Sequence, residues 1–209
     1  MICLSDNDII HKLAACDLLD DVLAALSLAR TDVYVLPTAK YRFRIAQRNV
    51  AQAEQRYGAE VLARIRDFLA SVREINFPGL PEELQLLAAV DGIDPGEAVL
   101  FAATSQFSQY LLATGDKNSL RALVSTPTCR PIAQRICGHV ICLEQIVKRV
   151  IQHCGFSYVQ GKIIPARACD TALRVAFGSG CDATEANVLA ALGSYINELR
   201  SLATDFSVA

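Results

Sequence analysis

Short apolar runs alternate with longer segments of helical periodicity along the first 125 residues. The runs have the length of buried strands and end at polar residues or at proline, whereas the segments between them repeat apolar positions every three or four residues. Strands alternating with helices predict an α/β protein with a mostly parallel sheet covered on both faces, a three-layer α/β/α fold. The expected strands span 2–5, 33–36 and 110–114, and the expected helices span 9–28, 80–90, 95–108 and 119–123, with several more within 38–73.

Some helix starts are recognisable from side-chain chemistry. Asp94-Pro-Gly-Glu97 combines a capping Asp, a Pro at the first helical position and a Glu three residues after the cap. Asp8 is expected to cap the helix that follows the first strand. The cluster of Asp17, Asp20 and Asp21 is either a solvated helix face or a second helix start.

Residues 125–131 show no clear helix or strand pattern and suggest a boundary between two parts of the chain. A strand is expected after them at 139–143, and helices are expected at 144–153 and 183–202. We therefore predict two parts. Residues 1–125 form the α/β domain, and residues 126–209 form a mostly helical C-terminal extension packed on it. The apolar character of 190–202 suggests a contact with a partner or a homodimer.

The composition argues against a membrane-spanning or secreted protein. The chain is 52% hydrophobic, yet no apolar run approaches the roughly 18 residues that a membrane span needs. The N-terminus has no basic segment typical of a signal peptide, so we expect a cytoplasmic protein with no membrane contact and reduced cysteines. Cysteines near 137–142 allow a zinc site, although cysteine acting as a small buried apolar residue is the favoured interpretation. The net charge of −2 provides no overall attraction to nucleic acid.

Acidic residues stand where two of the predicted strands end. Asp6 and Asp116 each follow a strand, and Glu97 opens the helix that leads into the third strand. If the first and third strands are neighbours, these acids meet at one edge of the sheet. Clustered carboxylates stay ionised only beside a cation, and Mg²⁺ or Mn²⁺ with oxygen ligands fits that need. Taken singly, Asp8, Asp94 and Asp116 are also explained as helix caps.

Three motifs resemble those of PIN domains, which are metal-dependent ribonucleases. The strand ending at Asp6, followed by Asn7 and Asp8, resembles the first motif; Gly96-Glu97-Ala98 resembles the acidic helix start; and the strand ending in Thr-Gly-Asp116 resembles the last motif. The resemblance covers residues 1 to about 125. It implies a PIN-like three-layer fold and RNA hydrolysis, with an antitoxin-like protein as a partner in some relatives. The implied catalytic residues are Asp6, Glu97 and Asp116, and the implied Mg²⁺ or Mn²⁺ ligands are Asp6, Asp8, Asp94, Glu97 and Asp116.

The sequence departs from the family where another acid is expected after the second strand. Residues 38–44 carry basic side chains there instead. Such a segment suits the phosphate backbone of RNA, with nearby aromatic rings stacking on bases. The alternative is a solvated helix face paired with neighbouring acids, or a surface for the partner protein. The predicted RNA contacts are Lys40, Arg42, Arg44, Arg48 and Lys117, and the predicted stacking residues are Tyr41, Phe43 and Tyr57.

Two other functions compete with a ribonuclease. Asp6-Asn7-Asp8 after a strand is similar to the nucleophile motif of haloacid-dehalogenase phosphatases, although Ile9 follows where that motif continues with glycine. The second alternative is a catalytically inactive PIN-like binding protein, which the missing acid motivates.

Overall fold

A five-stranded, fully parallel sheet forms the centre of the molecule. The structure is a computed structural model that describes residues 1–45, 50–77 and 79–202, with side chains described as far as residue 198. The strand order is β3-β2-β1-β4-β5, which confirms the predicted α/β class with a mostly parallel sheet. The strands are β1 (Ile2–Ser5), β2 (Val33–Val35), β3 (Arg73–Glu74), β4 (Tyr110–Ala113) and β5 (Val140–Ile141).

β1 and β4 are neighbours in the sheet. The expected meeting of Asp6, Glu97 and Asp116 at one edge of the sheet required this pairing. They pair in parallel with Leu4 opposite Leu112 and Ser5 opposite Ala113. The ladder continues one step further, because the backbone N–H of Asp6 donates to the carbonyl oxygen of Ala113 at 3.0 Å. Asp6 is therefore held at the carboxyl edge of the sheet, beside the end of β4.

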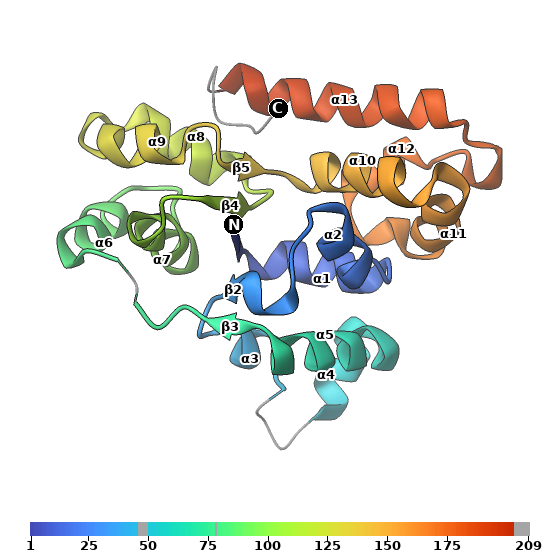
Figure 1. Ribbon diagram of the computed structural model, residues 1–209, viewed down its shortest axis with the longest axis horizontal. Helices are drawn as coiled ribbons and strands as arrows, with labels where there is room; N and C mark the ends of the chain where they lie inside the picture. Colours follow the sequence, from blue (N-terminus) through green and yellow to red (C-terminus); the bar gives the residue numbers. More distant parts are fainter. Residues whose placement is uncertain (46–49, 78, 203–209) are drawn as a thin grey trace.

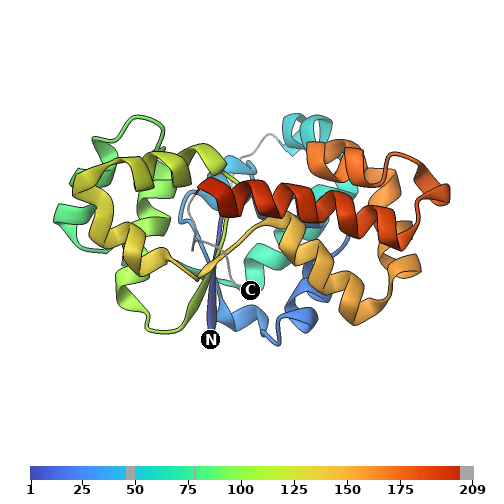
Figure 2. The same ribbon diagram turned by 90° about the horizontal axis from the view of Figure 1, so that it is seen from above.

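Helices cover both faces of the sheet (Figures 1 and 2). Successive residues of β1 point to opposite faces: Cys3 packs among α1, α2, α5 and α10, and Leu4 packs among α6, α7, α8 and α9. The helices are α1 (Asn7–Ala15), α2 (Leu19–Ala25), α3 (Ala39–Arg42), α4 (Val50–Tyr57), α5 (Ala59–Ser71), α6 (Pro81–Ala88), α7 (Pro95–Ala103), α8 (Lys117–Ser125), α9 (Arg130–Ile136), α10 (Leu143–Cys154), α11 (Phe156–Ala166), α12 (Thr171–Ala176) and α13 (Glu185–Leu202).

The first predicted helix is two helices. The backbone turns at Asp17, whose φ of 55° is in the left-handed region, and α2 then starts at Leu19. The acidic cluster thus marks a second helix start rather than the face of one long helix. The prediction that Asp8 caps α1 was wrong, because Asp6 occupies the capping position and Asp8 lies in the first turn.

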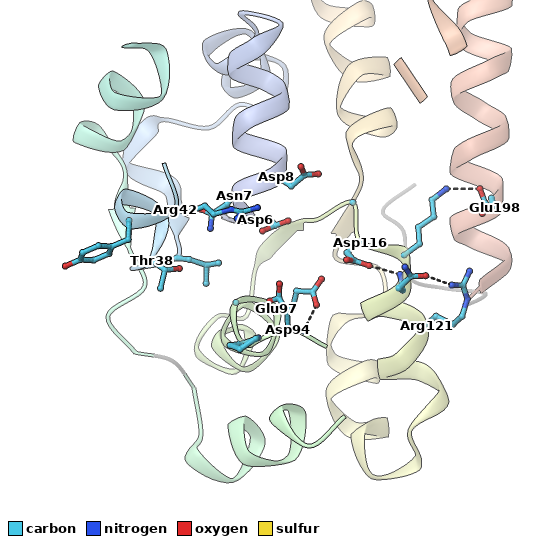
Figure 3. A pocket seen from close by; sticks show the side chains of 17 residues that line it. Asp6, Asn7, Asp8, Thr38, Arg42, Asp94, Glu97, Asp116, Arg121 and Glu198 are labelled. Atoms are coloured by element: carbon cyan, nitrogen blue, oxygen red, sulfur yellow. Dashed lines mark hydrogen bonds and ion pairs between the residues drawn. The ribbon is translucent and has the colours of Figure 1, made fainter. Parts of the chain in front are cut away.

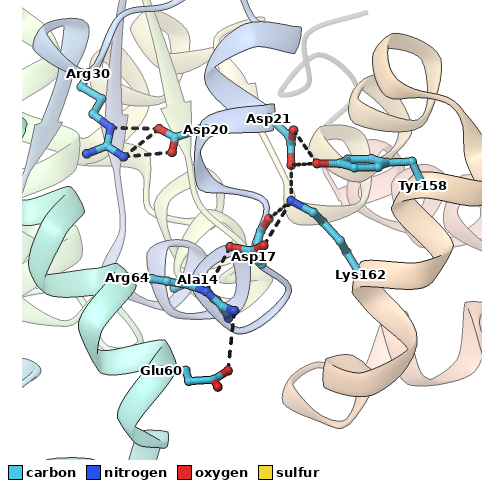
Figure 4. A network of polar contacts seen from close by, with 9 residues as sticks. All are labelled: Ala14, Asp17, Asp20, Asp21, Arg30, Glu60, Arg64, Tyr158 and Lys162. Carbon is cyan, nitrogen blue, oxygen red and sulfur yellow. Dashed lines mark hydrogen bonds and ion pairs between the residues drawn. The ribbon is translucent and has the colours of Figure 1, made fainter.

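A polar network joins the α1–α2 turn to helices far away in sequence (Figure 4). Asp17 pairs with Arg64 of α5 at 3.0 Å and with Lys162 of α11 at 3.2 Å, and Lys162 also reaches Asp21 at 3.0 Å. Arg64 therefore lies on a helix face that is paired with acids. The network connects elements on either side of residue 125.

The segment after residue 125 also contributes to the sheet. β5 pairs with β4 through Leu112 opposite Val140 and Ala113 opposite Ile141. The strand expected at 139–143 is thus present and lies beside β4. The division at residue 125 stays a prediction.

No helix among residues 1–45, 50–77 and 79–202 combines the length and apolarity needed to cross a bilayer.

Candidate functional site

The N-terminus of α7 is fixed by the capping box that the sequence predicted. The Asp94 carboxylate accepts from the backbone N–H of Glu97, and the Glu97 carboxylate accepts from the N–H of Asp94, both at 2.8 Å. Gly96 sits tightly here, because a Cβ added to it would come within 3.0 Å of Leu36 Cδ1. The first turn of α7 therefore packs closely against the end of β2, and the Glu97 side chain is only 6% exposed.

Asp116 caps α8 at the end of β4. Its Oδ1 accepts from the backbone N–H groups of Asn118 at 2.7 Å and Ser119 at 3.0 Å. These bonds orient the carboxylate at the carboxyl edge of the sheet. The capping explanation of Asp94 and Asp116 is thus correct, and it is compatible with a second role because each carboxylate also lines a cleft.

An open cleft of about 900 Å³ lies at this edge, and its lining includes Asp6, Asp94, Glu97 and Asp116. Asp6, Glu97 and Asp116 surround the same space, although they come from three different segments (Figure 3). Asp8 also lines the cleft, but its carboxylate pairs with Lys12 at 2.5 Å, and Lys12 pairs in turn with Asp170 at 2.8 Å. Asp8 is thus partly neutralised by a cation from its own helix.

Burial and neighbouring acids raise the pKa values of two carboxyl groups in the cleft. Burial raises the pKa of Asp6 to about 6, and the charges of Asp8 and Asp94 add to the effect. Burial likewise raises the pKa of Glu97 to about 7, with repulsion from Asp116 and Asp94 as further causes. A group that resists ionisation for these reasons is stabilised in its charged form when a cation binds beside it.

The donor chemistry of the cleft fits a hard divalent cation. Carboxylate oxygens are the preferred ligands of Mg²⁺, and the buried Oδ1 of Asn7 has no hydrogen-bond partner among the described residues. Within the described part of the chain, no three His, Cys, Asp or Glu side chains are grouped closely enough to enclose an ion. Mg²⁺ suits such a spread of donors, because it keeps several of its waters and takes only one or two carboxylates directly.

Basic side chains stand at the rim of the cleft. Arg42 and Lys117, both predicted to contact RNA, line it together with Arg121. The other predicted contacts are placed differently: Lys40 pairs with Glu74 at 2.7 Å, Arg44 bonds to the side chain of Gln52, and Arg48 lies outside the described residues.

Sequence reasoning missed Arg121 and Glu198 as cleft residues. Arg121 follows Lys117 by one helical turn, so the spacing along α8 contained a signal for it. Glu198 of α13 had no such signal, because its position depends on how the last helix packs. It pairs with Lys117 at 2.8 Å, and the Lys117 ammonium lies 5.2 Å from the centre of the Tyr195 ring.

Comparison of the chain with family models, with curated proteins and with solved structures finds no match. The chemistry of the cleft therefore carries the functional inference.

Proposed function

We propose that this chain is a PIN-like, divalent-metal-dependent ribonuclease whose active site is the acidic cleft at the carboxyl edge of the sheet. The observation that carries the proposal is that Asp6, Glu97 and Asp116 line one cleft, although they come from the segment after β1, the first turn of α7 and the segment after β4. Carboxylates that gather in one cleft repel one another unless a cation offsets their charge, and the Glu97 carboxylate is buried as well. The three PIN-like motifs contain these same residues, and they support RNA as the substrate.

Each group has a distinct task in this proposal. Asp6, Glu97 and Asp116 hold Mg²⁺ or Mn²⁺, directly or through its waters, and Asn7 accepts a hydrogen bond from a bound water. The ion would lower the pKa of a water molecule and offset charge on the scissile phosphate. Arg42, Lys117 and Arg121 contact phosphates on either side, which positions the backbone without reading its sequence.

The phosphatase alternative is less well supported. In Asp6-Asn7-Asp8, the second Asp of the pattern is the carboxylate that pairs with Lys12. The basic rim is likewise more useful for a polymer than for a small phosphate ester.

The first experiment measures Mn²⁺-dependent cleavage of a panel of structured and single-stranded RNAs. We expect cleavage by the wild type, loss of cleavage on chelation, and loss in Asp116→Asn. Asparagine caps helices as well as aspartate does, so this variant removes the charge but keeps the α8 cap. Asp182→Asn, at an exposed position away from the cleft, is the control. Wild-type protein that binds RNA but never cleaves it would replace the proposal with an inactive binding protein.

Glu198 is expected to weaken RNA binding by holding Lys117. Glu198 is more than half exposed, so solvent screens its attraction to Lys117 and the pair is weak. In Glu198→Gln, we expect the Kd for a short RNA to fall by about 2- to 5-fold, with a steeper dependence on salt. Glu185→Gln, an exposed acid at the other end of α13, is the matched control. An unchanged Kd in Glu198→Gln would remove Lys117 from the binding surface.

A further inference from the structure

The three aromatic residues near the basic rim differ sharply in accessibility. Phe43 is only 1% exposed and packs edge-on against Tyr57, with ring centres 5.6 Å apart. Tyr57 also contacts the ring of His11 at 5.1 Å. Tyr41, in contrast, is 68% exposed and lines the acidic cleft. Of the three predicted stacking residues, Tyr41 is the one whose ring is open to a ligand.

Tyr41 is exposed although the helix that carries it is firmly attached. Ala39, the first residue of α3, and Phe43, which follows its last residue, are both only 1% exposed. The neighbouring Lys40 pairs with Glu74 on β3, and the backbone N–H of Ile45 donates to the carbonyl of Lys40 at 2.9 Å. The Tyr41 ring is thus presented by a short, well-anchored helix. Exposing a large ring in a fixed place gains nothing for folding, since burial is what makes aromatic rings stabilising.

The Tyr41 ring lies at one end of the path that an RNA backbone would take across the acidic cleft. Arg42 lies at one side of the cleft and Arg121 at the other, with Asp6, Glu97 and Asp116 between them (Figure 3). A strand whose phosphates contact both arginines passes over the acids. Its next nucleotide on the Arg42 side then comes beside Tyr41, the residue adjacent to Arg42 in α3.

We propose that Tyr41 is a specificity residue that stacks on the base of an unpaired nucleotide next to the scissile phosphate. This inference rests on the proposed function of the cleft. An exposed tyrosine face accepts any base, because every base has a π-face. A nucleotide within a duplex cannot present that face, since its own neighbours already stack on it. Tyr41 therefore makes the enzyme select unpaired segments without selecting their sequence.

Binding is tested first, with a fluorescent reporter at the proposed contact. The chain has no tryptophan, so Tyr41→Trp introduces a single indole, and Asp116→Asn in the same protein prevents cleavage. We expect a short single-stranded RNA of mixed sequence to quench this fluorescence and a duplex of the same sequence to leave it nearly unchanged. The matched control is Tyr158→Trp in the Asp116→Asn background, because Tyr158 is 46% exposed and contacts Asp21 outside the acidic cleft. Equal quenching by duplex and single strand, or at both positions, would overturn the proposal.

Turnover provides the second test. For single-stranded RNA, we expect Tyr41→Ala to raise KM roughly 10-fold with a small change in kcat, and Tyr41→Phe to behave like the wild type, because stacking needs the ring and not the hydroxyl. An unchanged KM in Tyr41→Ala would contradict the inference while leaving the nuclease proposal intact. Selective quenching in a protein that never cleaves RNA would have the opposite meaning: the stacking contact stands and the nuclease proposal fails.

Discussion

Glu97→Gln is expected to abolish RNA cleavage and, at the same time, to stabilise the metal-free protein. Glutamine keeps the oxygen that accepts from the N–H of Asp94, and it serves in capping boxes as glutamate does. The variant therefore removes a charge and little else. Without that charge, the cleft loses a ligand for the ion, and we expect cleavage to fall by about 10³-fold or more, which corresponds to roughly 4 kcal/mol.

The gain in stability follows from the raised pKa of Glu97. Burial and the nearby charges of Asp116 and Asp94 raise this pKa to about 7, so at pH 8 the folded protein contains an ionised group that the fold disfavours. Glutamine removes this cost, and we expect the free energy of unfolding at pH 8 to rise by on the order of 2 kcal/mol. Denaturant titration measures it, with Glu82→Gln in the first turn of α6 as the control. A destabilised Glu97→Gln protein would mean that the carboxylate has a structural role that the amide cannot replace.

Manganese is expected to stabilise the wild-type protein strongly at pH 8 and hardly at all at pH 5.5. The pKa values of about 6 for Asp6 and about 7 for Glu97 mean that both acids are largely protonated at the lower pH, where they cannot bind the ion. At the higher pH both are charged, and the Mn²⁺ that binds only to the folded state raises the melting temperature. At 100 times its Kd, the expected gain is about 2.7 kcal/mol.

The metal-free protein should show the opposite trend with pH. Both acids have higher pKa values in the folded state than in the unfolded chain, so the folded state binds more protons in the window from about pH 4 to pH 7. These two groups therefore lower the stability as pH rises through that window. Thermal melts with and without Mn²⁺ should diverge as the pH rises from 5.5 to 8, and Asp116→Asn should narrow the gap between the curves. Equal stabilisation by Mn²⁺ at both pH values would place the ion elsewhere on the protein.

Much of the site was predictable because its determinants are local. The apolar runs before Asp6 and Asp116 predicted β1 and β4, and the spacing of Asp94 and Glu97 predicted the capping box. Parallel pairing then brings strand ends together without further information. The sequence left open whether the first and third predicted strands are neighbours, and the pairing of β1 with β4 supplies that step.

The remaining features depend on contacts between distant segments. β3 is only two residues long and has no periodicity of its own, so the helical pattern around it concealed it. The partner of Lys12 beyond Asp8 is Asp170, which is 158 residues further along the chain. Glu198 reaches the cleft because Val188, Leu192 and Ile196 anchor α13 along one face. The local sequence pattern around these residues does not predict any of these contacts.

The strand order has a consequence for association between copies of the chain. The outermost strands, β3 and β5, have two residues each, whereas the four-residue β1 and β4 lie inside the sheet. An unpaired strand edge is a template for pairing with another chain, and very short edge strands offer little length for it. β4 has four buried residues and relies on β5 to cover one side. The segment after residue 125 thus shields an aggregation-prone strand edge, in addition to whatever it contributes to the cleft.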